Sequence, residues 1–386
     1  MKPFKLLHVM AAVAPRYGGP SSAIWPMLNA LHNAGVDVEL VTTDADGPSQ
    51  RLSANQLPKV SFPVHLLPGP GQLPNELAAW VRSNIKRFNI LHTHGIWHRH
   101  GTAAMSESRR AGVPYVIRTC GMLAPYSWKR RWWKKRPYWW LFERANVRGA
   151  AVLHVTSPGE RAEVEAWRLP ASVCEIPLGL DASAFDTPRQ AETLRKRCGT
   201  NVGNRPIVLF LGRLHPVKGI TDVLLPAFSR MKTDAFLAIV GGPAEDAPQY
   251  ESEITSQIQR LGIEKSVALL GAVSGSEKWG CYDGAAVYVQ PSRTENFGLS
   301  VAEAMARGCP VIVTEGVQSR SVVEAANGGW IVPYDPNALA ATLDVALSDS
   351  DVSSAKGRAG CEYVRQELGW DRIAEKLATV YQTLIH

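Results

Sequence analysis

The chain has 386 residues, of which 45% are hydrophobic and 20% charged, and it carries a formal net charge of +7. Its length suits two folded domains, and the absence of low-complexity tracts and fixed-period repeats argues against disordered linkers and solenoids. The positive charge favours anionic partners such as nucleic acid, anionic lipid or phosphorylated small molecules. Six scattered cysteines without a C-x-x-C pair argue against structural zinc and a disulfide framework, and favour a reducing compartment.

The first apolar run, residues 6–14, has two interpretations. One is a signal peptide with an A-x-A site, and the other is a first buried strand that leads into a glycine loop. His8 interrupts the run, and a helix-like segment follows Gly18 and Gly19 directly, so we favour the strand. No segment approaches the roughly 18 consecutive apolar residues that a membrane span needs.

In the N-terminal half, short apolar runs alternate with amphipathic stretches. This order is typical of βαβ units in a parallel, doubly wound α/β sheet. A helix is predicted over 21–34. The predicted strands cover 5–13, 36–43, 90–94, 115–118 and 151–156.

The C-terminal half restarts the same pattern after a polar stretch at 181–204. Its predicted strands cover 206–211, 235–240, 267–270, 287–290 and 310–313. Apolar residues at helical spacing predict a final helix over 370–385. The predicted boundaries are 1–180 for the first domain, 181–205 for a linker, 206–366 for the second domain and 367–386 for the final helix. Open sheets of this kind bind ligands at their strand carboxyl ends.

A basic motif, Gly212-Arg213-Leu214-His215-Pro216-Val217-Lys218-Gly219, directly follows a predicted strand. Arginine offers a planar fork of donors that suits phosphate oxygens, and lysine adds a mobile point charge. The pair could hold a diphosphate. A solvated basic turn is the alternative interpretation of such a motif taken alone.

An acidic motif follows the strand predicted over 287–290. Glu295 and Glu303 are eight residues apart, about 12 Å if the segment were helical throughout. That span is comparable to the distance from a hexose to a ribose across a diphosphate. The expected helix N-terminus at Gly298-Leu299-Ser300 offers free N–H groups to an anion. Alternatively, each glutamate is an ordinary helix-terminal or surface residue.

Together these motifs resemble family 4 of the glycosyltransferases, which are retaining enzymes of GT-B fold with an E-x7-E signature. The resemblance covers nearly the whole chain. It includes Gly18-Gly19, Leu91-His92-Thr93-His94-Gly95, Gly121-Met122-Leu123, Ile176–Asp181, the basic and acidic motifs, and the terminal segment Trp370–Tyr381.

The resemblance implies two Rossmann-like domains that face each other across a cleft, the first for the acceptor and the second for a nucleotide-sugar donor. It also implies that the final helix crosses back to the first domain. Arg213 and Lys218 would bind the donor diphosphate in place of a metal. Glu303 would hold the ribose, and Glu295 the transferred sugar.

Further donor contacts are implied for the loop before the predicted helix and for the first glycine loop. The residues are Asn296, Phe297, Gly298 and Leu299, together with Gly18 and Gly19. Cys120 stands where relatives often have a sugar-contacting histidine, and Pro177-Leu178-Gly179 where they have P-N-G. We predict contact with the sugar or acceptor for His94 and Cys120, although His94 is equally consistent with a buried structural histidine.

The implied reaction transfers a sugar, with retention, from a UDP- or GDP-sugar to a hydroxyl of a glycan or lipid-diphosphate-linked acceptor. Bacterial exopolysaccharide, O-antigen or another cell-surface glycan is the expected product. No cofactor and no metal are expected, and Asp44-Ala45-Asp46 is interpreted as a chance D-x-D turn. A nucleotide-sugar epimerase of the same architecture is the alternative function.

Residues Trp128–Trp140 concentrate five of the 12 tryptophans beside a run of lysines and arginines. Indoles with cations suit the headgroup zone of an anionic bilayer. We therefore expect a cytoplasmic protein that contacts the inner face of the cell membrane. The alternative is that the tryptophans pack under neighbouring helices. A nucleic-acid partner is not expected, because it would leave Glu295 and Glu303 unexplained.

Overall fold

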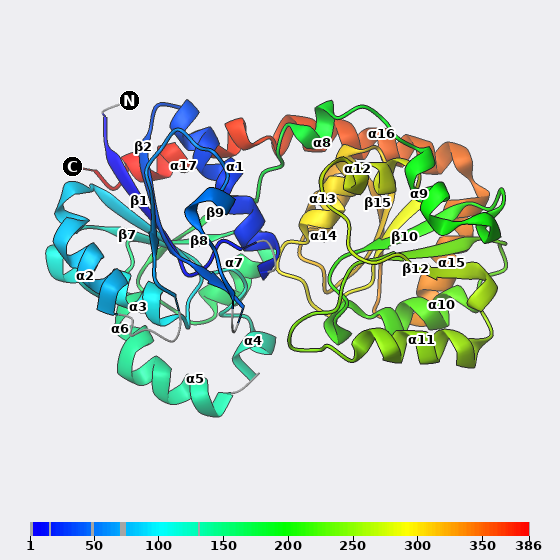
Figure 1. The fold of residues 1–386 in the computed structure, drawn as a ribbon, viewed down its shortest axis with the longest axis horizontal. Helices are drawn as coiled ribbons and strands as arrows, with labels where there is room; N and C mark the ends of the chain where they lie inside the picture. Colours follow the sequence, from blue (N-terminus) through cyan, green and yellow to red (C-terminus); the bar gives the residue numbers. More distant parts are fainter. Residues whose placement is uncertain (1–2, 15–16, 48–49, 70–74, 130–131, 386) are drawn as a thin grey trace. The chain divides into compact units, whose positions relative to one another are not determined.

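The computed structural model describes residues 3–14, 17–47, 50–69, 75–129 and 132–385. The chain divides into two compact units (Figure 1). The first contains residues 1–179 and 370–386, and the second contains residues 180–369. Each unit is built around its own parallel sheet.

The first unit has a seven-stranded sheet in which all neighbouring strands are parallel. In spatial order the strands are β5 (Val64–Leu67), β2 (Asp37–Thr43), β1 (Lys5–Met10), β6 (Ile90–His94), β7 (Tyr115–Arg118), β8 (Val152–Val155) and β9 (Ser172–Glu175). A small antiparallel pair, β3 (Ala45–Asp46) and β4 (Gln50–Arg51), follows β2.

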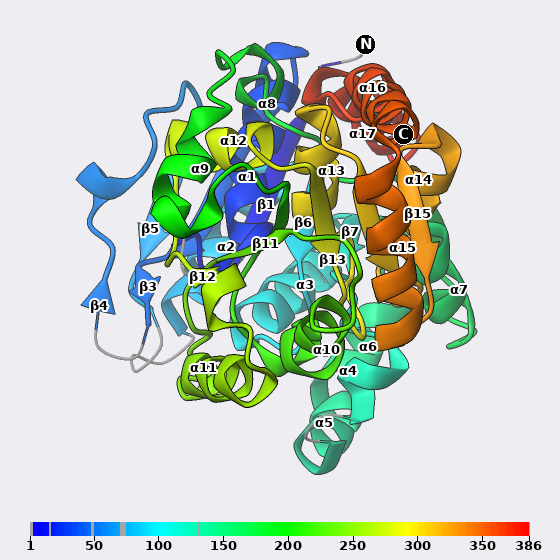
Figure 2. The same cartoon turned by 90° about the vertical axis from the view of Figure 1, so that its right-hand side faces the viewer.

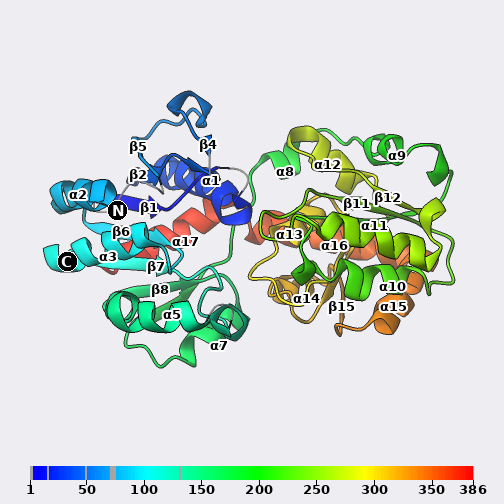
Figure 3. The same ribbon diagram turned by 60° about the horizontal axis from the view of Figure 1, so that its bottom comes forward.

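Helices cover both faces of this sheet. They are α1 (Gly19–Asn33), α2 (Asn75–Asn84), α3 (Arg99–Ala111), α4 (Pro125–Lys129), α5 (Trp132–Tyr138), the π-helix η4 (Trp139–Glu143), α6 (Arg144–Arg148), α7 (Pro158–Glu165) and α17 (Trp370–Gln382), with 3₁₀ turns η2 (Ala54–Gln56) and η3 (Ile85–Arg87). Side chains alternate between the faces of a strand. Leu7, Leu91 and Ile117 therefore share one apolar core with α2 and α3. The other face meets α17, which packs against α1 (Figures 1 and 3).

The second unit has a six-stranded parallel sheet. In spatial order its strands are β12 (Val267–Leu269), β11 (Phe236–Val240), β10 (Ile207–Leu211), β13 (Val287–Gln290), β14 (Val311–Thr314) and β15 (Gly329–Val332). The strand order reverses between β10 and β13. Ligands of doubly wound sheets bind at the carboxyl ends of the strands at such a switch point.

Helices again lie on both faces (Figures 1 and 2). They are α8 (Ser183–Asp186), α9 (Glu192–Cys198), the π-helix η7 (Ile220–Leu224), α10 (Leu225–Phe228), α11 (Tyr250–Leu261), α12 (Gly275–Asp283), α13 (Leu299–Ala306), α14 (Arg320–Ala326), α15 (Pro336–Ser348) and α16 (Ser350–Glu367), with 3₁₀ turns η5 (Thr200–Val202), η6 (Pro216–Lys218) and η8 (Glu264–Ser266). The apolar core under η7, α10, α11 and α15 contains Phe210, Ile239 and Ile312.

The segment expected as a linker, 181–205, contains α8, α9 and η5 and clusters with the second unit. Its apolar residues explain this, because Ala184 and Leu194 are fully buried. The final helix, expected over 370–385, is α17 and clusters with the first unit.

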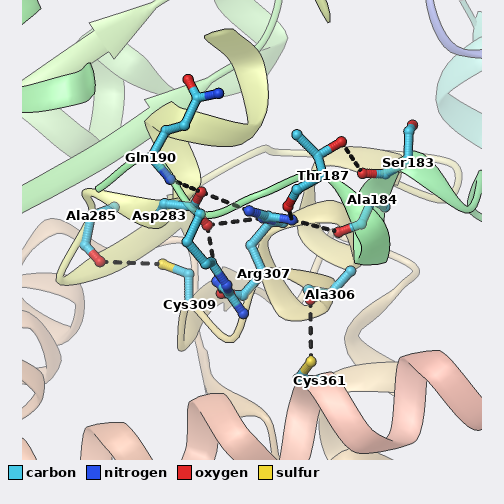
Figure 4. A network of polar contacts seen from close by, with 11 residues as sticks. Ser183, Ala184, Thr187, Gln190, Asp283, Ala285, Ala306, Arg307, Cys309 and Cys361 are labelled. Atoms are coloured by element: carbon cyan, nitrogen blue, oxygen red, sulfur yellow. Dashed lines mark hydrogen bonds and ion pairs between the residues drawn. The ribbon is translucent and has the colours of Figure 1, made fainter. Parts of the chain in front are cut away.

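A buried ion pair holds the 181–191 segment in place (Figure 4). Arg307, just after α13, donates to both carboxylate oxygens of Asp283 at 2.8 and 2.7 Å, and both side chains are 1% exposed. The same guanidinium donates to the carbonyls of Ala184 and Thr187. Asp283 also accepts from the Gln190 N–H. Every charged atom of the pair has a partner, so the burial is compensated.

The apolar N-terminal run forms β1, as the strand interpretation predicts. Strands β6, β7 and β13 have the predicted bounds, whereas β5, β9 and β15 were not predicted. All six cysteines are free thiols. Within the described residues, no helix is both long and apolar enough to cross a membrane.

Candidate functional site

The basic motif leaves the carboxyl end of β10 in a loop that pairs with the loop after β11. Leu214 donates its N–H to the carbonyl of Gly242 at 2.8 Å, and Ala244 donates back to Leu214 at 3.0 Å. A Cβ at Gly241 would overlap the carbonyl oxygen of Gly212, so the two loops require glycine at this approach. Arg213 is exposed, and its guanidinium has no polar partner within the part of the chain that the structure describes.

Lys218 ends the turn η6, which packs against the loop after β13. The His215 side chain caps the turn by accepting from the Val217 N–H at 3.0 Å. Gly219 has a left-handed φ of 70°, and a Cβ there would overlap the carbonyl oxygen of Pro291. This close approach brings the Lys218 ammonium onto the Glu295 carboxylate, with side chains 13% and 22% exposed.

Glu295 lies in an extended loop and is fixed by its backbone. It donates to the carbonyl of Gly316 at 3.0 Å and accepts from the Gln318 N–H at 3.1 Å. Helix α13 begins only at Leu299, after Gly298 with a φ of 76°. The helix N-terminus expected at Gly298-Leu299-Ser300 is therefore confirmed, and the span of a fully helical segment does not apply because the first half of the spacing is loop.

A polar cluster lies beneath the start of α13. The buried Tyr288 hydroxyl contacts the Gln290 side chain and Ser300, the latter at 2.8 Å, and Gln290 donates to Ser292 at 2.7 Å. These bonds hold the carboxyl end of β13 against the helix.

Above this cluster lies the loop that was predicted to contact the donor. The N–H groups of Phe297, Gly298 and Leu299 have no acceptor among the described residues, so they remain open to an anion at the helix N-terminus. The Phe297 side chain is 3% exposed, so only its backbone is offered to a ligand. Asn296 is half-buried in the same loop.

Glu303 lies one turn into α13 and receives one donor on each carboxylate oxygen. The Lys278 ammonium donates at 2.8 Å and the Tyr282 hydroxyl at 2.9 Å, both from α12. Burial, and then the charge of Glu303, raise the pKa of Tyr282 well above its ordinary value, so it remains a donor. A carboxylate offers about four acceptor positions, so Glu303 keeps capacity for two further hydroxyls.

Lys278 and Tyr282 were missed by sequence reasoning. Their four-residue spacing on a helix was the available signal, because it places both on one face. The second unit thus places Lys218 beside Glu295 and Lys278 beside Glu303 on either side of the open N–H groups of α13, and Arg213 follows β10 in the neighbouring loop.

In the first unit, His94 and Cys120 line one cavity of about 510 Å³. Its wall also includes Tyr17, Trp97 and Met122. Cys120 has a left-handed φ of 51°, uncommon for a residue with a Cβ. Gly18, with a φ of 79°, precedes α1, which begins at Gly19.

Behind this cavity, the sheet carries a buried layer of histidines. The His8 and His94 rings share a hydrogen bond of 2.9 Å, and His92 contacts the Tyr381 hydroxyl of α17 at 2.7 Å. His8, His92 and His94 each offer a ring nitrogen within 4.8 Å of the others. His154 adds a fourth ring, 5.6 Å from that of His92. Sequence reasoning considered His94 alone, although alternate positions on paired strands share a face.

The charge of Arg118 bears on whether this layer suits a metal. Burial, and then Arg118 and His154, lower the pKa of His8 to about 3, and burial lowers that of His154 to about 3 as well. The pKa values of His92 and His94 are also well below the ordinary value, with burial as the main cause and Arg118 contributing. The rings are therefore neutral at pH 7. A divalent cation would meet the same repulsion from the buried guanidinium, so we assign no metal here.

The D-x-D turn has a local structural role. The Asp44 carboxylate accepts from the Gly69 N–H at 2.5 Å and lies 3.7 Å from the Arg51 guanidinium. Among the described residues, the histidine group is the only cluster with metal-ligand proximity, and Asp44 does not belong to it.

Comparisons with known proteins agree with this architecture. Residues 193–361 match the family model described as glycosyl transferases group 1, and residues 18–179 match the glycosyl transferase 4-like domain. The chain is 28% identical to the D-inositol 3-phosphate glycosyltransferase of Xylanimonas cellulosilytica, over 94% of this chain and 91% of that protein. It is 27% identical to the alpha-maltose-1-phosphate synthase of Mycolicibacterium smegmatis, over 95% of each.

Solved structures show the same fold. Sucrose-phosphate synthase from Thermosynechococcus elongatus superimposes with a TM-score of 0.79 at 22% identity, covering 98% of this chain and 99% of that one. Anabaena HepE in complex with UDP and glucose gives a TM-score of 0.79 at 19% identity, covering 98% and 100%. Both units are thus Rossmann-like domains of the GT-B type. The epimerase alternative gains no support from these relatives.

Proposed function

The chain belongs to the group 1 glycosyltransferases, and on that premise we propose that it transfers a sugar from a UDP- or GDP-linked donor to a hydroxyl of a glycan or lipid-diphosphate-linked acceptor. The observation that carries this proposal is the arrangement around α13, where Lys218 contacts Glu295 in the loop before the helix and Lys278 contacts Glu303 within it, with Arg213 in the loop after β10.

In this proposal the donor lies along that group. The diphosphate occupies the space in front of the open N–H groups of 297–299, where the helix dipole and Arg213 favour negative charge. Glu303 accepts from the ribose hydroxyls with the capacity that Lys278 and Tyr282 leave free. The complex of HepE with UDP and glucose supports a nucleotide-sugar donor by analogy of fold.

Lys218 links the two ends of the donor. An ammonium has three donors, so Lys218 can keep its bond to Glu295 while it donates to a phosphate oxygen. As the bond from the anomeric carbon to the phosphate oxygen breaks, negative charge grows on the departing nucleotide, and the two fixed cations stabilise it without a metal. The acceptor oxygen bonds to the anomeric carbon on the same face, and its proton goes to the leaving phosphate.

The acceptor belongs to the first unit in this proposal. The cavity beside His94 and Cys120 is lined mainly by apolar and aromatic side chains, such as Trp97 and Met122, which suit a sugar face or an apolar aglycone. The product of the proposed transfer would be a cell-surface glycan made at the cytoplasmic side of a membrane.

Thermal-shift titration with UDP, GDP, ADP and their sugar conjugates tests the donor site. We expect stabilisation by one nucleotide series, with binding weakened at least about 10-fold by Arg213→Ala and by Glu303→Gln, because each removes a charge-assisted hydrogen bond.

Asp44→Asn is the matched control, since it changes a carboxylate outside the group, and it should leave nucleotide affinity unchanged. Equal loss in all three variants, or no stabilisation by any nucleotide, would refute the assignment. EDTA should not abolish transfer; loss that Mg²⁺ or Mn²⁺ restores would refute the metal-free mechanism.

A further inference from the structure

One part of the first unit exposes large apolar side chains together. Tyr126, Trp132, Trp133, Trp140, Leu141 and Phe142 are between 46% and 72% exposed, and we call them the aromatic surface. They lie on α4, α5 and η4, at the periphery of the unit (Figure 1). So many large exposed apolar side chains in one short segment are unusual on a protein that meets only water.

The other side of these helices is anchored by packed indoles, which fixes what faces outward. Trp128 and Trp139 each contact Trp97 and Trp167, with ring centroids 4.9 to 5.7 Å apart, and they contact each other at 6.1 Å. The Trp97 and Trp167 N–H groups donate to backbone carbonyls at 3.1 and 2.9 Å. Of the five tryptophans in the basic segment, two are therefore structural, and only Trp132, Trp133 and Trp140 are available to a partner.

Within the segment that carries the aromatic surface, cations far outnumber acids. Residues 125–148 contain eight lysines and arginines and one acid, Glu143. Glu143 is fully buried and accepts from the backbone N–H of Trp97 and from the Thr102 hydroxyl, at 2.8 and 2.7 Å. Lys134 and Arg144 lie over the rings of Trp133 and Trp140, 4.8 and 4.6 Å from the centroids. Arg130 and Arg131 lie outside the described residues.

We propose that this surface docks the protein on an anionic phospholipid bilayer. Indole rings enter the headgroup zone while neighbouring ammonium and guanidinium groups meet lipid phosphates. The spacing of Trp133, Arg136 and Trp140 places an apolar, a charged and an apolar side chain along one helical stripe. The proposed function bears on this inference only by supplying a lipid-linked acceptor, since docking needs neither donor nor acceptor.

Flotation with vesicles tests the proposal on the full chain without substrates. We expect binding to phosphatidylcholine vesicles that contain about a third phosphatidylglycerol, and little binding to phosphatidylcholine alone. Neutralising Lys129, Lys134, Arg136 and Arg144 to Gln should weaken binding by about 100-fold or more, since each cation near the surface contributes roughly a factor of five. Trp133→Ser with Trp140→Ser should weaken it by about 10-fold or more.

Two control variants carry matched changes in the second unit. The first replaces Lys196, Arg260, Lys265 and Arg358 with Gln, which removes the same charge from exposed positions. The second replaces Val345 and Val352 with Ser, which removes exposed apolar side chains. Both should bind vesicles as the unmodified chain does.

Equal loss in test and control variants, or equal binding to neutral vesicles, would overturn the proposal. The proposal would also be overturned if light scattering showed a dimer that dissociates when Trp133 and Trp140 are replaced. A higher affinity for nucleic acid than for vesicles would overturn it as well. Nucleotide thermal shifts of the same variants should be unchanged, which separates failure of docking from failure of the donor site.

Discussion

The two units share the order of six strands, to which the first unit adds β9, and they differ in where they place charge. In the second unit the buried ionic groups Arg307 and Asp283 neutralise each other, and the unpaired polar capacity lies at the strand ends around α13. In the first unit the buried layer under α17 contains neutral histidines beside Arg118, which is 2% exposed. The same topology therefore leaves open polar groups at the strand ends of one unit and encloses neutral histidines in the other.

This difference teaches that a doubly wound sheet determines where a site can be, and side chains determine what it binds. In the second unit, Gly219 lets the basic motif approach Pro291 until Lys218 and Glu295 meet, and Gly241 lets the loops after β10 and β11 approach each other. In the first unit, the rings of His8, His92 and His94 instead fill the face of the sheet that α17 covers.

The largest expected effect concerns the paired charges of the second unit. Arg307→Met leaves the buried Asp283 carboxylate with only Arg189 and the Gln190 N–H as partners among the described residues, and we expect this to destabilise the second unit by about 3–5 kcal/mol. Hydrogen exchange should show faster opening of β13 and α13, with the first unit unchanged. Adding Asp283→Asn removes the second charge and should recover part of the loss; a further loss would contradict this account of the pair.

The next effect concerns the open charges at the strand ends. Lys218→Ala should lower kcat by about 10²–10³, because one fixed donor to the departing phosphate is removed. Initial rates with the donor that gives the largest thermal shift would measure this. Lys196→Ala, an exposed lysine on α9, is the control. A rate for the Lys218 variant within threefold of the unmodified chain would exclude Lys218 from the reaction.

The smallest expected effect, counted per side chain, is the pH dependence of stability that the histidine layer gives to the first unit, and it sharpens the contrast between the units. The folded-state pKa values of His8 and His154 are lowered to about 3, so the unfolded chain binds more protons below pH 6.5. The part of the free energy of unfolding that depends on these two neutral rings is fully present above pH 6.5 and is lost as the pH falls towards 3. At pH 5 each should cost the first unit about 2 kcal/mol relative to pH 7.

Urea unfolding followed by hydrogen exchange at pH 7 and pH 5 would measure this contribution. Strands β1 and β8 should lose protection before β10 and β11. His8→Leu should reduce the difference between the two pH values. Equal acid sensitivity of both sheets would show that the histidine layer does not control the first unit.

The order of the elements could be predicted from the sequence because buried parallel strands are short apolar runs. The bounds of β6, β7 and β13 were predicted correctly for this reason. The strand β9 was missed because its residues are exposed or half-buried, and it carries Ser172 and Glu175. The helices in 181–205 were missed because their few buried residues, such as Leu194, stand among polar neighbours.

For the candidate site, the sequence indicated the residues but not their partners. Spacing alone could not show that Lys218 contacts Glu295, because 77 residues separate them and the contact depends on Gly219 passing close to Pro291. The donors to Glu303 lie on a helix that carries no recognisable motif. The exposure of each tryptophan could not be predicted either, since Trp128 and Trp133 both lie in the basic segment, yet Trp128 packs against Trp167 and Trp133 is 61% exposed.

The return of the chain to the first unit makes the second unit an insertion. Where the chain enters the second unit, the Leu180 N–H donates to the carbonyl of Leu368, where the chain leaves that unit, at 2.7 Å. Gly179 packs so closely on Trp370 that a Cβ would overlap the indole. Residues 180–369 are thus a contiguous piece with adjacent ends, suited to excision or circular permutation. A chain that stopped at 369 would instead deprive the histidine layer of Tyr381 and leave the inner face of β1 and β6 uncovered by α17.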